Sequence, residues 1–404
     1  MSGELTGMVR LDHYLDGPIR NGFSPVESAD WTGVQMLGLG CLTTDGFEPR
    51  QLKNAPHGIR SDHAALLRDG DLLLSRANTR ALVGLVGRYR DIGSPCIYPD
   101  LMMRLIPNDR CVPDFLEHLL TSAPVRRRIM ASAQGTSESM VKISADSVKQ
   151  LKVPLFSVAD QQRAVEVLDA FDARVEAEIG ALRKELSLWD GVINGQLSWH
   201  AQKFGTSSLR DVSHGGGAYG SNAAAVASDL RMPRYVRITD IDDQGKLSTD
   251  ASAAVSIPWE SARQYLLSEG DLLIARTGFT TGKTYLYQPE DGVCAFAGYL
   301  VRFRINPERM LPEYAFLWTR GQAFATWVAR NVREVGQRNI SAREYNQHQV
   351  AVPPLDVQEE LVRAWRAARA SHSLRQLEIE RLRVLRQAVS VDLLSGKVRV
   401  GDVA

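Results

Sequence analysis

Two short runs of residues in this chain carry the side chains needed to contact nucleic acid. The first is Arg76-Ala77-Asn78-Thr79-Arg80, and the second, residues 276–283, reads Arg-Thr-Gly-Phe-Thr-Thr-Gly-Lys. Arginine can hydrogen-bond a guanine edge through two donors, asparagine can do the same with adenine, and lysine and threonine suit phosphate oxygens. A single basic run is more often a solvated surface. Because both runs follow a Gly-Asp-Leu-Leu pattern, beginning at residues 70 and 270, we interpret them as matching DNA-contact loops.

Further basic residues extend these runs into local positive patches. The formal net charge is only +1, so a nucleic-acid surface has to be a local cluster rather than a global excess. Arg126-Arg127-Arg128 adds positive charge beside a predicted helix. The residues that we predict to contact DNA are Arg76, Asn78, Thr79, Arg80, Lys142, Arg237, Arg276, Thr277, Thr280, Lys283 and Arg338.

Known catalytic and metal-binding patterns are missing, which favours a non-catalytic chain. Residues 278–284, Gly-Phe-Thr-Thr-Gly-Lys-Thr, resemble a phosphate-binding loop, but three residues instead of four separate the glycines, and a strand pattern follows where a helix is required. The chain has no H-E-x-x-H, no G-x-S-x-G and no Asn/Asp-Pro-Pro-Tyr/Phe tetrad. Its four cysteines show no C-x-x-C spacing, so we expect reduced cytosolic thiols, no metal site and no cofactor on this chain.

The same sequence pattern occurs twice, in order, along the chain. Gly70-Asp71-Leu72-Leu73-Leu74-Ser75-Arg76 returns as residues 270–276, Val112-Pro113-Asp114-Phe115 returns as residues 311–314, and Gln161 returns as Gln358. The offset is 200 residues at the first of these motifs and 197 at the last. Two copies of one module predict a pseudo-twofold tandem repeat with two similar sites.

Each copy divides into a globular module and a long helix. Residues 1–156 and 205–354 mix short apolar runs with turn signals, which predicts two mixed modules of the α/β (α+β) class. Within the second module, residues 207–228 have little to bury, and we interpret them as a mobile loop or a disordered linker. The expected buried strands are Leu72–Ser75 and Leu272–Ala275, and the expected helices are Pro113–Met130 and Pro312–Arg330.

The remaining segments, 157–204 and 355–404, are predicted to be long helices. Apolar residues step by three and four from Val165 onward and, less regularly, from Leu361 onward, which is typical of a helix that pairs with another helix. We expect an antiparallel coiled coil of helices of about 28 residues, or roughly 42 Å, with Gly195 as a stop in the first. The alternative is that each helix packs only on its own module. The stripe residues that we predict to hold partner proteins are Val165, Leu168, Val175, Ile179, Leu182, Leu361, Trp365, Ile379 and Leu382.

Taken together, these motifs resemble the specificity subunit of type I restriction-modification systems over nearly the whole chain. Gly270-Asp271-Leu272-Leu273-Ile274-Ala275-Arg276-Thr277-Gly278 is similar to the core motif of that family's target-recognition domain. Val352-Pro353-Pro354-Leu355-Asp356-Val357-Gln358-Glu359 is similar to the segment that leads into its long conserved helix, and Leu393-Leu394-Ser395-Gly396-Lys397 to the end of that helix. The set is specific because it occurs in order and twice.

The resemblance implies a DNA-recognition subunit without catalysis of its own. It implies two target-recognition domains (1–156 and 205–354), each reading half of a bipartite, asymmetric double-stranded DNA target, and two conserved helices (157–204 and 355–404) that separate them. It also implies two methyltransferase subunits and motor/nuclease subunits as partners. S-adenosylmethionine, ATP and Mg would be used by those partners.

The first copy departs from the family motif, and an alternative reading stays open. Arg76-Ala77-Asn78-Thr79 stands where Arg-Thr-Gly is expected, and Phe156-Ser157 replaces the Pro-Pro-Leu approach to the helix, so we expect the two modules to read different half-sites. The chain shows no signal peptide and no apolar run of membrane-spanning length, which predicts a cytoplasmic protein without membrane contact. The alternative is a specificity or adaptor subunit of another phage-defence methylation system; a two-site enzyme or a protein-only scaffold fits the residues less well.

Overall fold

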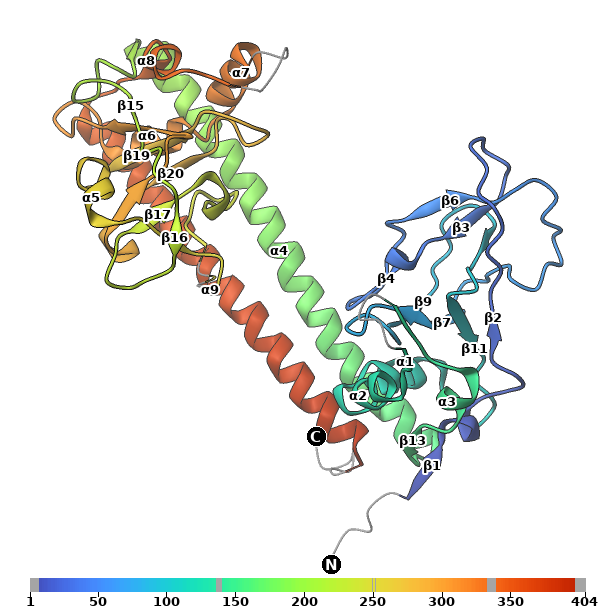
Figure 1. Ribbon diagram of the computed structural model, residues 1–404. Helices are drawn as coiled ribbons and strands as arrows, with labels where there is room; N and C mark the ends of the chain where they lie inside the picture. The colour runs from blue at the N-terminus through green and yellow to red at the C-terminus, as the bar shows by residue number, and fades with distance from the viewer. Residues whose placement is uncertain (1–6, 136–139, 249, 251, 333–338, 397–404) are drawn as a thin grey trace, which may run out of the picture. The chain divides into compact units, whose positions relative to one another are not determined.

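The chain forms two compact units in the computed structural model, which describes residues 7–135, 140–248, 250, 252–332 and 339–396. The first unit comprises Met1–Ile179 with Leu377–Ala404, and the second comprises Gly180–Gln376. Each unit contains one predicted module together with part of both long helices (Figure 1). Within the described residues, no helix is both long and apolar enough to cross a membrane.

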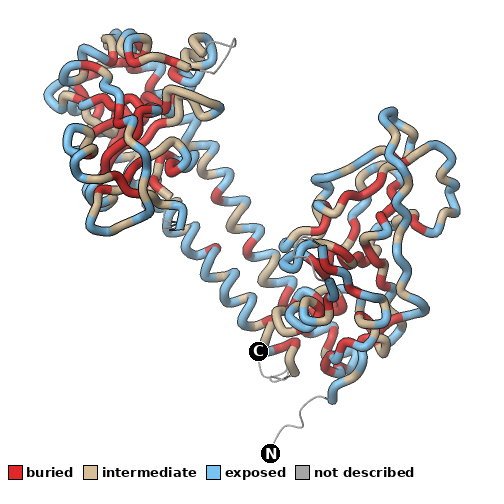
Figure 2. The backbone as a smooth tube through the Cα atoms, viewed as in Figure 1, coloured by how far each residue is buried: buried red, intermediate tan, exposed pale blue. Residues whose placement is uncertain are grey.

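The first unit is built around a four-stranded antiparallel sheet whose central strand is β7. The predicted strand Leu72–Ser75 is β7, and all four of its residues are buried (Figure 2). A run of leucines without polar alternation suits a strand covered on both faces. The sheet order is β2 (Arg20–Asn21), β11 (Met102–Leu105), β7 and β9 (Val86–Arg88); a second sheet has the order β10 (Cys96–Ile97), β3 (Gln35–Leu37) and β6 (Leu52–Asn54), with β10 and β3 parallel.

The second unit repeats this plan with longer strands. Its central strand is β19 (Asp271–Ala275), which is buried throughout and includes the predicted strand 272–275. The sheet order is β15 (Ala218–Tyr219), β22 (Leu300–Arg304), β19 and β20 (Thr284–Leu286); the second sheet has the order β16 (Val226–Ala227), β18 (Val255–Ser256), β17 (Arg234–Val236) and β21 (Cys294–Phe296), with β17 and β21 parallel. The predicted tandem repeat of mixed α/β modules is therefore confirmed.

Shorter elements complete each unit. The two-stranded pairs are β1 (Met8–Arg10) with β13 (Lys152–Pro154), β8 (Ala77–Asn78) with β12 (Val141–Lys142), β4 (Leu42–Thr43) with β5 (Gly46–Phe47), and β14 (Thr206–Ser208) with β23 (Gln349–Ala351). Short helices lie at α3 (Ala145–Lys149), α5 (Trp259–Ala262) and α8 (Ala342–Asn346), and 3₁₀ turns at Leu11–Tyr14, Leu39–Cys41, Ile238–Asp240, Arg263–Tyr265 and Pro289–Asp291.

Each of the two helices predicted inside the modules is in fact two helices. In the first unit α1 (Pro113–Thr121) ends at Ser122, whose extended ψ of 141° starts α2 (Ala123–Ser132) in a new direction. Pro124 occupies the first turn of α2 and has no N–H to continue the preceding helix. The second unit breaks at the corresponding place, between α6 (Pro312–Trp318) and α7 (Gln322–Asn331).

The segment expected to be a mobile loop or linker, 207–228, contributes strands instead. It contains most of β14 and all of β15 and β16, which pair with β23, β22 and β18. Small residues bury little by themselves, but the ladders of neighbouring strands supply backbone hydrogen-bond partners for them. The interpretation of this segment as a disordered linker was therefore wrong.

The two long helices are longer than the sequence pattern suggested. Helix α4 spans Val158–Phe204, 47 residues, and α9 spans Leu355–Leu394, 40 residues. Gly195 was expected to stop the first helix but lies inside it. The stop is Gly205, whose φ of +78° lies in the left-handed region that glycine adopts at low cost.

The long helices run antiparallel within each unit. In the first unit Arg386 of α9 donates to Asp172 of α4, at 2.9 and 3.0 Å. In the second unit the Arg375 guanidinium lies 3.3 Å from a carboxylate oxygen of Glu185. Rising numbers on α4 meet falling numbers on α9, which confirms the predicted antiparallel coiled coil.

One buried glutamine per repeat joins each long helix to its module. Gln161 is fully buried; its Oε1 accepts from the Val112 N–H at 2.8 Å, and its Nε2 donates to the Arg110 carbonyl at 2.8 Å and the Phe156 carbonyl at 3.2 Å. Its repeat partner is bonded to the corresponding atoms of the second unit. Gln358 accepts from Leu311 (2.8 Å) and donates to Arg309 (3.1 Å) and Pro353 (2.8 Å). The recurrence of this glutamine in the sequence therefore has a structural cause.

Candidate nucleic-acid interface

The first predicted DNA-contact run lies in a tight loop, residues 76–84, which we call loop 1. It joins β7 to β9 and is closed by two backbone hydrogen bonds, from the Ser75 N–H to the Leu85 carbonyl and from the Gly84 N–H to the Ser75 carbonyl, both 2.7 Å. Gly84 has a φ of +71°, and a Cβ at this position would collide with the side chain of Ile129. Only glycine fits this closing position, so the backbone path of the loop is fixed there.

The second run lies in the equivalent loop, residues 276–282, which we call loop 2. It joins β19 to β20 and is closed in the same way: the Ala275 N–H donates to the Lys283 carbonyl at 2.8 Å and the Gly282 N–H donates to the Ala275 carbonyl at 2.9 Å. Gly282 has a φ of +90° and packs on Val328. Loop 2 is two residues shorter than loop 1, so the frame is shared while the tip differs.

The arginine at the start of each loop is anchored through its backbone by the same neighbour. The carbonyl of Arg76 accepts from the Ile143 N–H, and the carbonyl of Arg276 accepts from the Ile340 N–H, each at 2.9 Å. Each of these isoleucines begins an Ile-Ser-Ala triplet, at residues 143–145 in the first copy and 340–342 in the second. Both arginines therefore leave their strands at equivalent points.

The two arginine side chains have different surroundings. Arg76 reaches the carbonyl of Asp100 at 3.4 Å. Arg276 lies over the ring of Tyr219, 4.6 Å from its centroid, and its Nε has no hydrogen-bond partner in the described part of the chain. Tyr219 is fixed in turn, because its hydroxyl accepts from the Ala342 N–H at 3.0 Å. The stacked guanidinium of Arg276 is preoriented, which lowers the entropy cost of a directed contact.

The structure brings together the predicted contacts of the first module. Asn78 lies in β8, which pairs with β12, so that Lys142 lies one register position away from it. Thr79 and Arg80 follow in the exposed turn of loop 1, and Asn78 Oδ1 accepts from the Thr79 N–H at 2.8 Å. The amide of Asn78, the hydroxyl of Thr79 and the cations of Arg80 and Lys142 thus belong to one small region of the first module. The predicted contact Arg338 lies outside the described residues.

Loop 2 contains a residue that the sequence reasoning missed. Phe279 is 94% exposed at its tip. Thr277 pairs with Asn339 in an isolated bridge, and the Thr280 carbonyl accepts from the Lys283 N–H at 2.9 Å. An apolar ring at the tip of a rigid turn suits apolar contact with a base, for example a thymine methyl group. The signal was available, because Phe279 lies within the second DNA-contact run.

Two predicted contacts are held by carboxylates inside the second unit. The Nζ of Lys283 lies 2.8 Å from a carboxylate oxygen of Asp243 and donates to the Ile241 carbonyl at 3.1 Å. Arg237 donates to both carboxylate oxygens of Asp240, at 2.8 and 3.1 Å, which raises the pKa of Arg237. The positive charge of Lys283 is balanced by Asp243, and that of Arg237 by Asp240. These two residues are placed to shape the module, and a DNA contact by either would have to compete with its carboxylate.

The predicted partner-binding stripe is covered partly by the modules, because Val165 and Leu168 pack in the core of the first unit and Leu361 and Trp365 in the core of the second. Buried and half-buried positions also recur along the rest of both long helices (Figure 2), as expected of an apolar seam that faces another helix. These side chains are therefore not a free surface in this chain, and their role in partner binding stays a prediction. Leu168, Val175, Leu182, Leu361 and Ile379 are buried, and Val165, Ile179, Trp365 and Leu382 are half-buried. The exposed large apolar residues of the described parts of the two helices lie elsewhere: Val158, Leu188, Val192, Trp199, Leu355, Leu374, Leu377, Val384 and Leu385.

One group of side chains in the described residues has the composition of a metal site. His118, Asp169 and Asp172 lie together in the first unit. His118 Nε2 is 2.9 Å from Asp169, its Nδ1 is 3.1 Å from the Arg386 guanidinium, and Arg386 also pairs with Asp172. The guanidinium already provides the positive charge that a metal would bring, so the group is an ion-pair network between α1, α4 and α9.

Comparisons with known proteins bear on the fold. No protein-family model matches the chain. Over 196 residues it is 24% identical to the type I restriction enzyme EcoKI specificity subunit of Escherichia coli (strain K12), a match that covers 46% of this chain and 42% of that protein. A chain from a structure on the complex assembly and conformational transition of a type I restriction-modification system has a TM-score of 0.61 at 15% identity and covers 98% of this chain and 99% of its own length. The type I restriction-modification S subunit from M. genitalium has a TM-score of 0.50 at 12% identity, and 97% of both chains is covered.

The fold is that of a type I specificity subunit. The resemblance inferred from the repeated motifs is therefore confirmed. The sequence match spans less than half of the length of the E. coli subunit. It is the structural likeness that extends over both modules and both long helices.

The first module departs from the specificity-subunit pattern where the chain enters its long helix. The second module has Pro353 there, which lacks an N–H, whereas the first has Phe156, whose buried N–H needs an acceptor. The Tyr14 hydroxyl supplies it at 2.8 Å and itself donates to the Pro154 carbonyl at 3.0 Å. The replaced proline is thus compensated by a tyrosine from the other end of the module.

Proposed function

We propose that this chain is the DNA-sequence-specificity subunit of a type I restriction-modification complex. Each module reads one half of a bipartite, asymmetric double-stranded DNA target through the loop that follows its central strand. The chain itself is not an enzyme. Two methyltransferase subunits use S-adenosylmethionine to methylate adenine, and motor/nuclease subunits use ATP and Mg, all in the cytoplasm.

One observation carries this proposal: loops 1 and 2 share one hydrogen-bonded frame but differ at their tips. Loop 1 presents Asn78, Thr79 and Arg80, whereas loop 2 presents Phe279 beside the stacked Arg276. A shared frame with different side chains is what two readers of different half-sites require. The same pattern would have no purpose in a symmetric scaffold that binds only protein.

The methyltransferase subunits need an accessible apolar surface on the long helices. Leu188 and Val192 of α4 are 61% and 52% exposed, and Val384 of α9 is 59% exposed. Exposed apolar side chains one turn apart on a helix favour a protein partner over solvent. We therefore assign the methyltransferase contacts to these residues in place of the covered stripe. Val192→Asp should prevent a complex from forming while the isolated chain stays folded, and an intact complex would contradict this assignment.

The proposal is tested by expressing the chain with the methyltransferase encoded beside it in a methylation-free host and sequencing the methylated adenines. We expect every modified site to carry a split motif with an unread gap. Methyltransferase expressed alone is the control and should leave these sites unmodified. A stable complex that modifies nothing would refute the proposal and favour the adaptor of another defence system, which a missing motor/nuclease gene nearby would also indicate.

The long helices are expected to set the gap between the half-sites. Removing one heptad from both α4 and α9 keeps their stripes in phase and shortens each by about 10 Å, which corresponds to roughly three base pairs. The methylated motif should keep both half-sites and lose about that many unread positions. Altered half-sites with an unchanged gap would refute the ruler role.

A further inference from the structure

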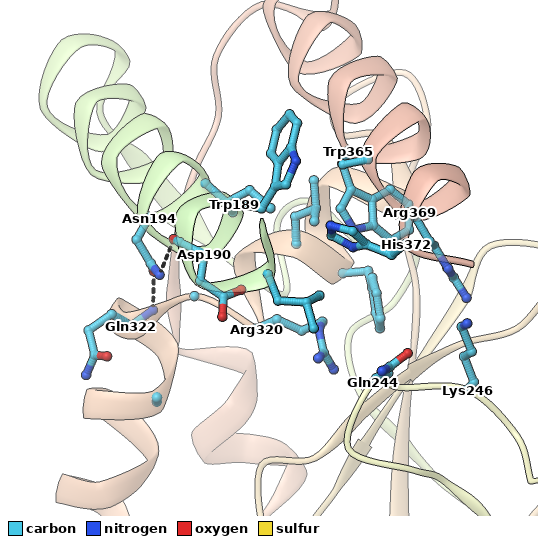
Figure 3. A pocket seen from close by; sticks show the side chains of 17 residues that line it. Trp189, Asp190, Asn194, Gln244, Lys246, Arg320, Gln322, Trp365, Arg369 and His372 are labelled. Atoms are coloured by element: carbon cyan, nitrogen blue, oxygen red, sulfur yellow. Dashed lines mark hydrogen bonds between the residues drawn. The ribbon is translucent and has the colours of Figure 1, made fainter. Parts of the chain in front are cut away.

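The second unit contains a cavity of about 430 Å³ whose arginines are balanced by acidic residues of the same chain (Figure 3). Aspartates act electrostatically on both arginines of its wall, Arg320 and Arg369. Trp189 lies on the far side of the cavity from Arg369, so the indole and the guanidinium do not form one binding site (Figure 3). The difference between the two units that bears on recognition lies instead beside loop 2.

The residue that stands beside the loop arginine differs between the two units. In the second unit Tyr219 lies on the edge strand β15, opposite Val301, and Val301 pairs with the central-strand residue two positions before the arginine. In the first unit Asn21 lies on the edge strand β2, opposite Met103, which pairs with the central strand at the same distance from its arginine. Asn21 and Tyr219 therefore occupy equivalent positions of the repeat. Because side chains at directly opposed positions and at i, i+2 share one face of a sheet, each lies on the same face as its loop arginine.

Tyr219 can fix the arginine of loop 2 because the tyrosine is itself held at both ends. Its backbone belongs to the β15–β22 ladder, and its hydroxyl accepts from the Ala342 N–H, at the start of α8, at 3.0 Å. The guanidinium of Arg276 lies 4.6 Å from the ring centroid. A ring face attracts a guanidinium and leaves the N–H edge of the cation available to another partner. The plane of the guanidinium is therefore set before DNA binds.

Arg76 lacks this support in the first unit. Among the described residues no aromatic ring lies against its guanidinium, and the hydrogen bond that the guanidinium donates to the Asp100 carbonyl is long, at 3.4 Å. Asn21 offers no ring at the position that Tyr219 occupies in the second unit. Arg76 therefore retains more orientations than Arg276, and it has to lose them when it contacts a base.

We propose that Tyr219 is a specificity-determining residue, which positions Arg276 on the edge of a guanine, and that Asn21 leaves Arg76 tolerant of other bases. Of the four bases, only guanine presents two acceptors in the major groove to a planar pair of donors. A guanidinium held in one plane loses affinity when that base is replaced, whereas one that can turn finds an acceptor on another base or on a phosphate. The inference rests on the proposed function, because it concerns how strictly each half-site is read.

The proposal is tested with the complex of the full chain and its methyltransferase, acting on DNA duplexes that each carry one base change in a half-site. The base position that each arginine reads is the one that Arg276→Ala or Arg76→Ala relaxes. The measured quantity is the ratio of the methylation rates with the preferred base and with the other bases at that position, which we call the stringency. In the wild type, the stringency should be at least about fivefold higher at the Arg276 position than at the Arg76 position.

Tyr219→Leu should lower the stringency at the Arg276 position by about fivefold or more, with the other half-site and the gap unchanged. Tyr219→Phe keeps the ring and should keep most of the stringency. Asn21→Leu, at the equivalent position of the first unit, is the matched control and should change neither half-site. In a chain that already carries Arg276→Ala, Tyr219→Leu should cause no further loss, because the tyrosine acts through the arginine.

Four results would overturn the proposal. A stringency that Tyr219→Leu leaves unchanged, or equal wild-type stringency at the two positions, would mean that the ring does not set the readout. A further loss in the Arg276→Ala chain would make Tyr219 a DNA contact of its own. Slower methylation of every duplex alike would mean that Tyr219 only stabilises the module. A wild-type complex that methylates no split motif would instead refute the proposed function, so the two failures are distinguishable.

Discussion

The two units form the same backbone contact with different side chains beside it. At the end of α3 and of α8 the chain turns back to pair with the start of the module: the Leu11 N–H donates to the Leu151 carbonyl in the first unit, and the Leu209 N–H donates to the His348 carbonyl in the second, both at 2.8 Å. Leu151 contributes to an apolar core. His348 instead accepts from the Trp318 indole N–H at 3.0 Å. The backbone hydrogen bond is common to both units, whereas the side chain at this position differs between them.

This difference separates residues that the fold requires from residues that each copy is free to change. The closing glycines of loops 1 and 2 and the two buried glutamines occur in both units because the frame depends on them. Tyr14 and His348 each occur in one unit only, because each satisfies a local need. The side chains at the tips of loops 1 and 2 also differ between the units. The repeat therefore maintains the frame and lets the surfaces vary, as two readers of different half-sites would need.

The largest expected effect comes from removing a frame residue. Gln161→Leu and Gln358→Leu each leave one buried carbonyl, one part-buried carbonyl and one part-buried N–H without the partners they have now, and should lower the free energy of unfolding by roughly 3–5 kcal/mol. Chemical denaturation of each variant, with hydrogen exchange to localise the loss, measures the effect. The exposed neighbour Gln162→Leu is the control. The two variants are expected to lose equal amounts of unfolding free energy. A variant as stable as the wild type would mean that its glutamine is not required by the fold.

A pH-dependent loss of stability is expected in the second unit, where His348 is buried. Burial lowers the pKa of His348 to about 4. The folded unit holds the neutral imidazole, so its stability is fully present above the unfolded pKa of about 6.5 and is lost as the pH falls from there toward about 4, by up to roughly 3 kcal/mol. Hydrogen exchange of β19 and β7 across this range compares the two units.

The variant His348→Leu gives the second unit the side chain that the first unit carries. It should lower stability at neutral pH, because the Trp318 N–H loses its acceptor, and should reduce the slope between pH 6.5 and 4. A slope that stays unchanged in this variant would assign the acid sensitivity to other groups.

A smaller effect is expected at the entry to the first long helix. Tyr14→Phe removes the acceptor of the Phe156 N–H and should lower the free energy of unfolding of the first unit by about 1–3 kcal/mol. Tyr299→Phe, at an exposed tyrosine of the second unit, is the control and should stay within about 0.5 kcal/mol of the wild type. Urea denaturation followed by circular dichroism measures both, and equal stability of the two variants would mean that the tyrosine does not compensate for the lost proline.

Much of this fold could be predicted because it depends on local pattern and on repetition. The leucine runs of β7 and β19 and the heptad stripes of α4 and α9 are written in consecutive residues. The repeat then placed loops 1 and 2 at matching positions. The helix break at Ser122 was missed because an apolar pattern continues across it, and the extent of α4 was missed because Gly195 fits an exposed helical position as well as a stop.

The side-chain environment of the site was harder to predict, because it depends on contacts between distant residues. Lys283 is neutralised by Asp243, 40 positions earlier, and Arg276 is stacked on Tyr219, 57 positions earlier. No local spacing indicates either pairing. The stripe residues were assigned to partners because a seam looks the same in sequence whether a helix of the same chain or of another protein covers it.

The claim that each module reads its own half-site is tested most directly by two matched variants, Arg76→Ala and Arg276→Ala. Each is expressed with the methyltransferase, and the methylated adenines are sequenced beside those of the wild-type complex. We predict that each variant relaxes base preference in one half-site, by about 1–3 kcal/mol at the position that its arginine contacts, and that the two variants affect opposite halves with the gap unchanged. Changes in the same half-site, or a uniform loss of modification at every sequence, would contradict the account.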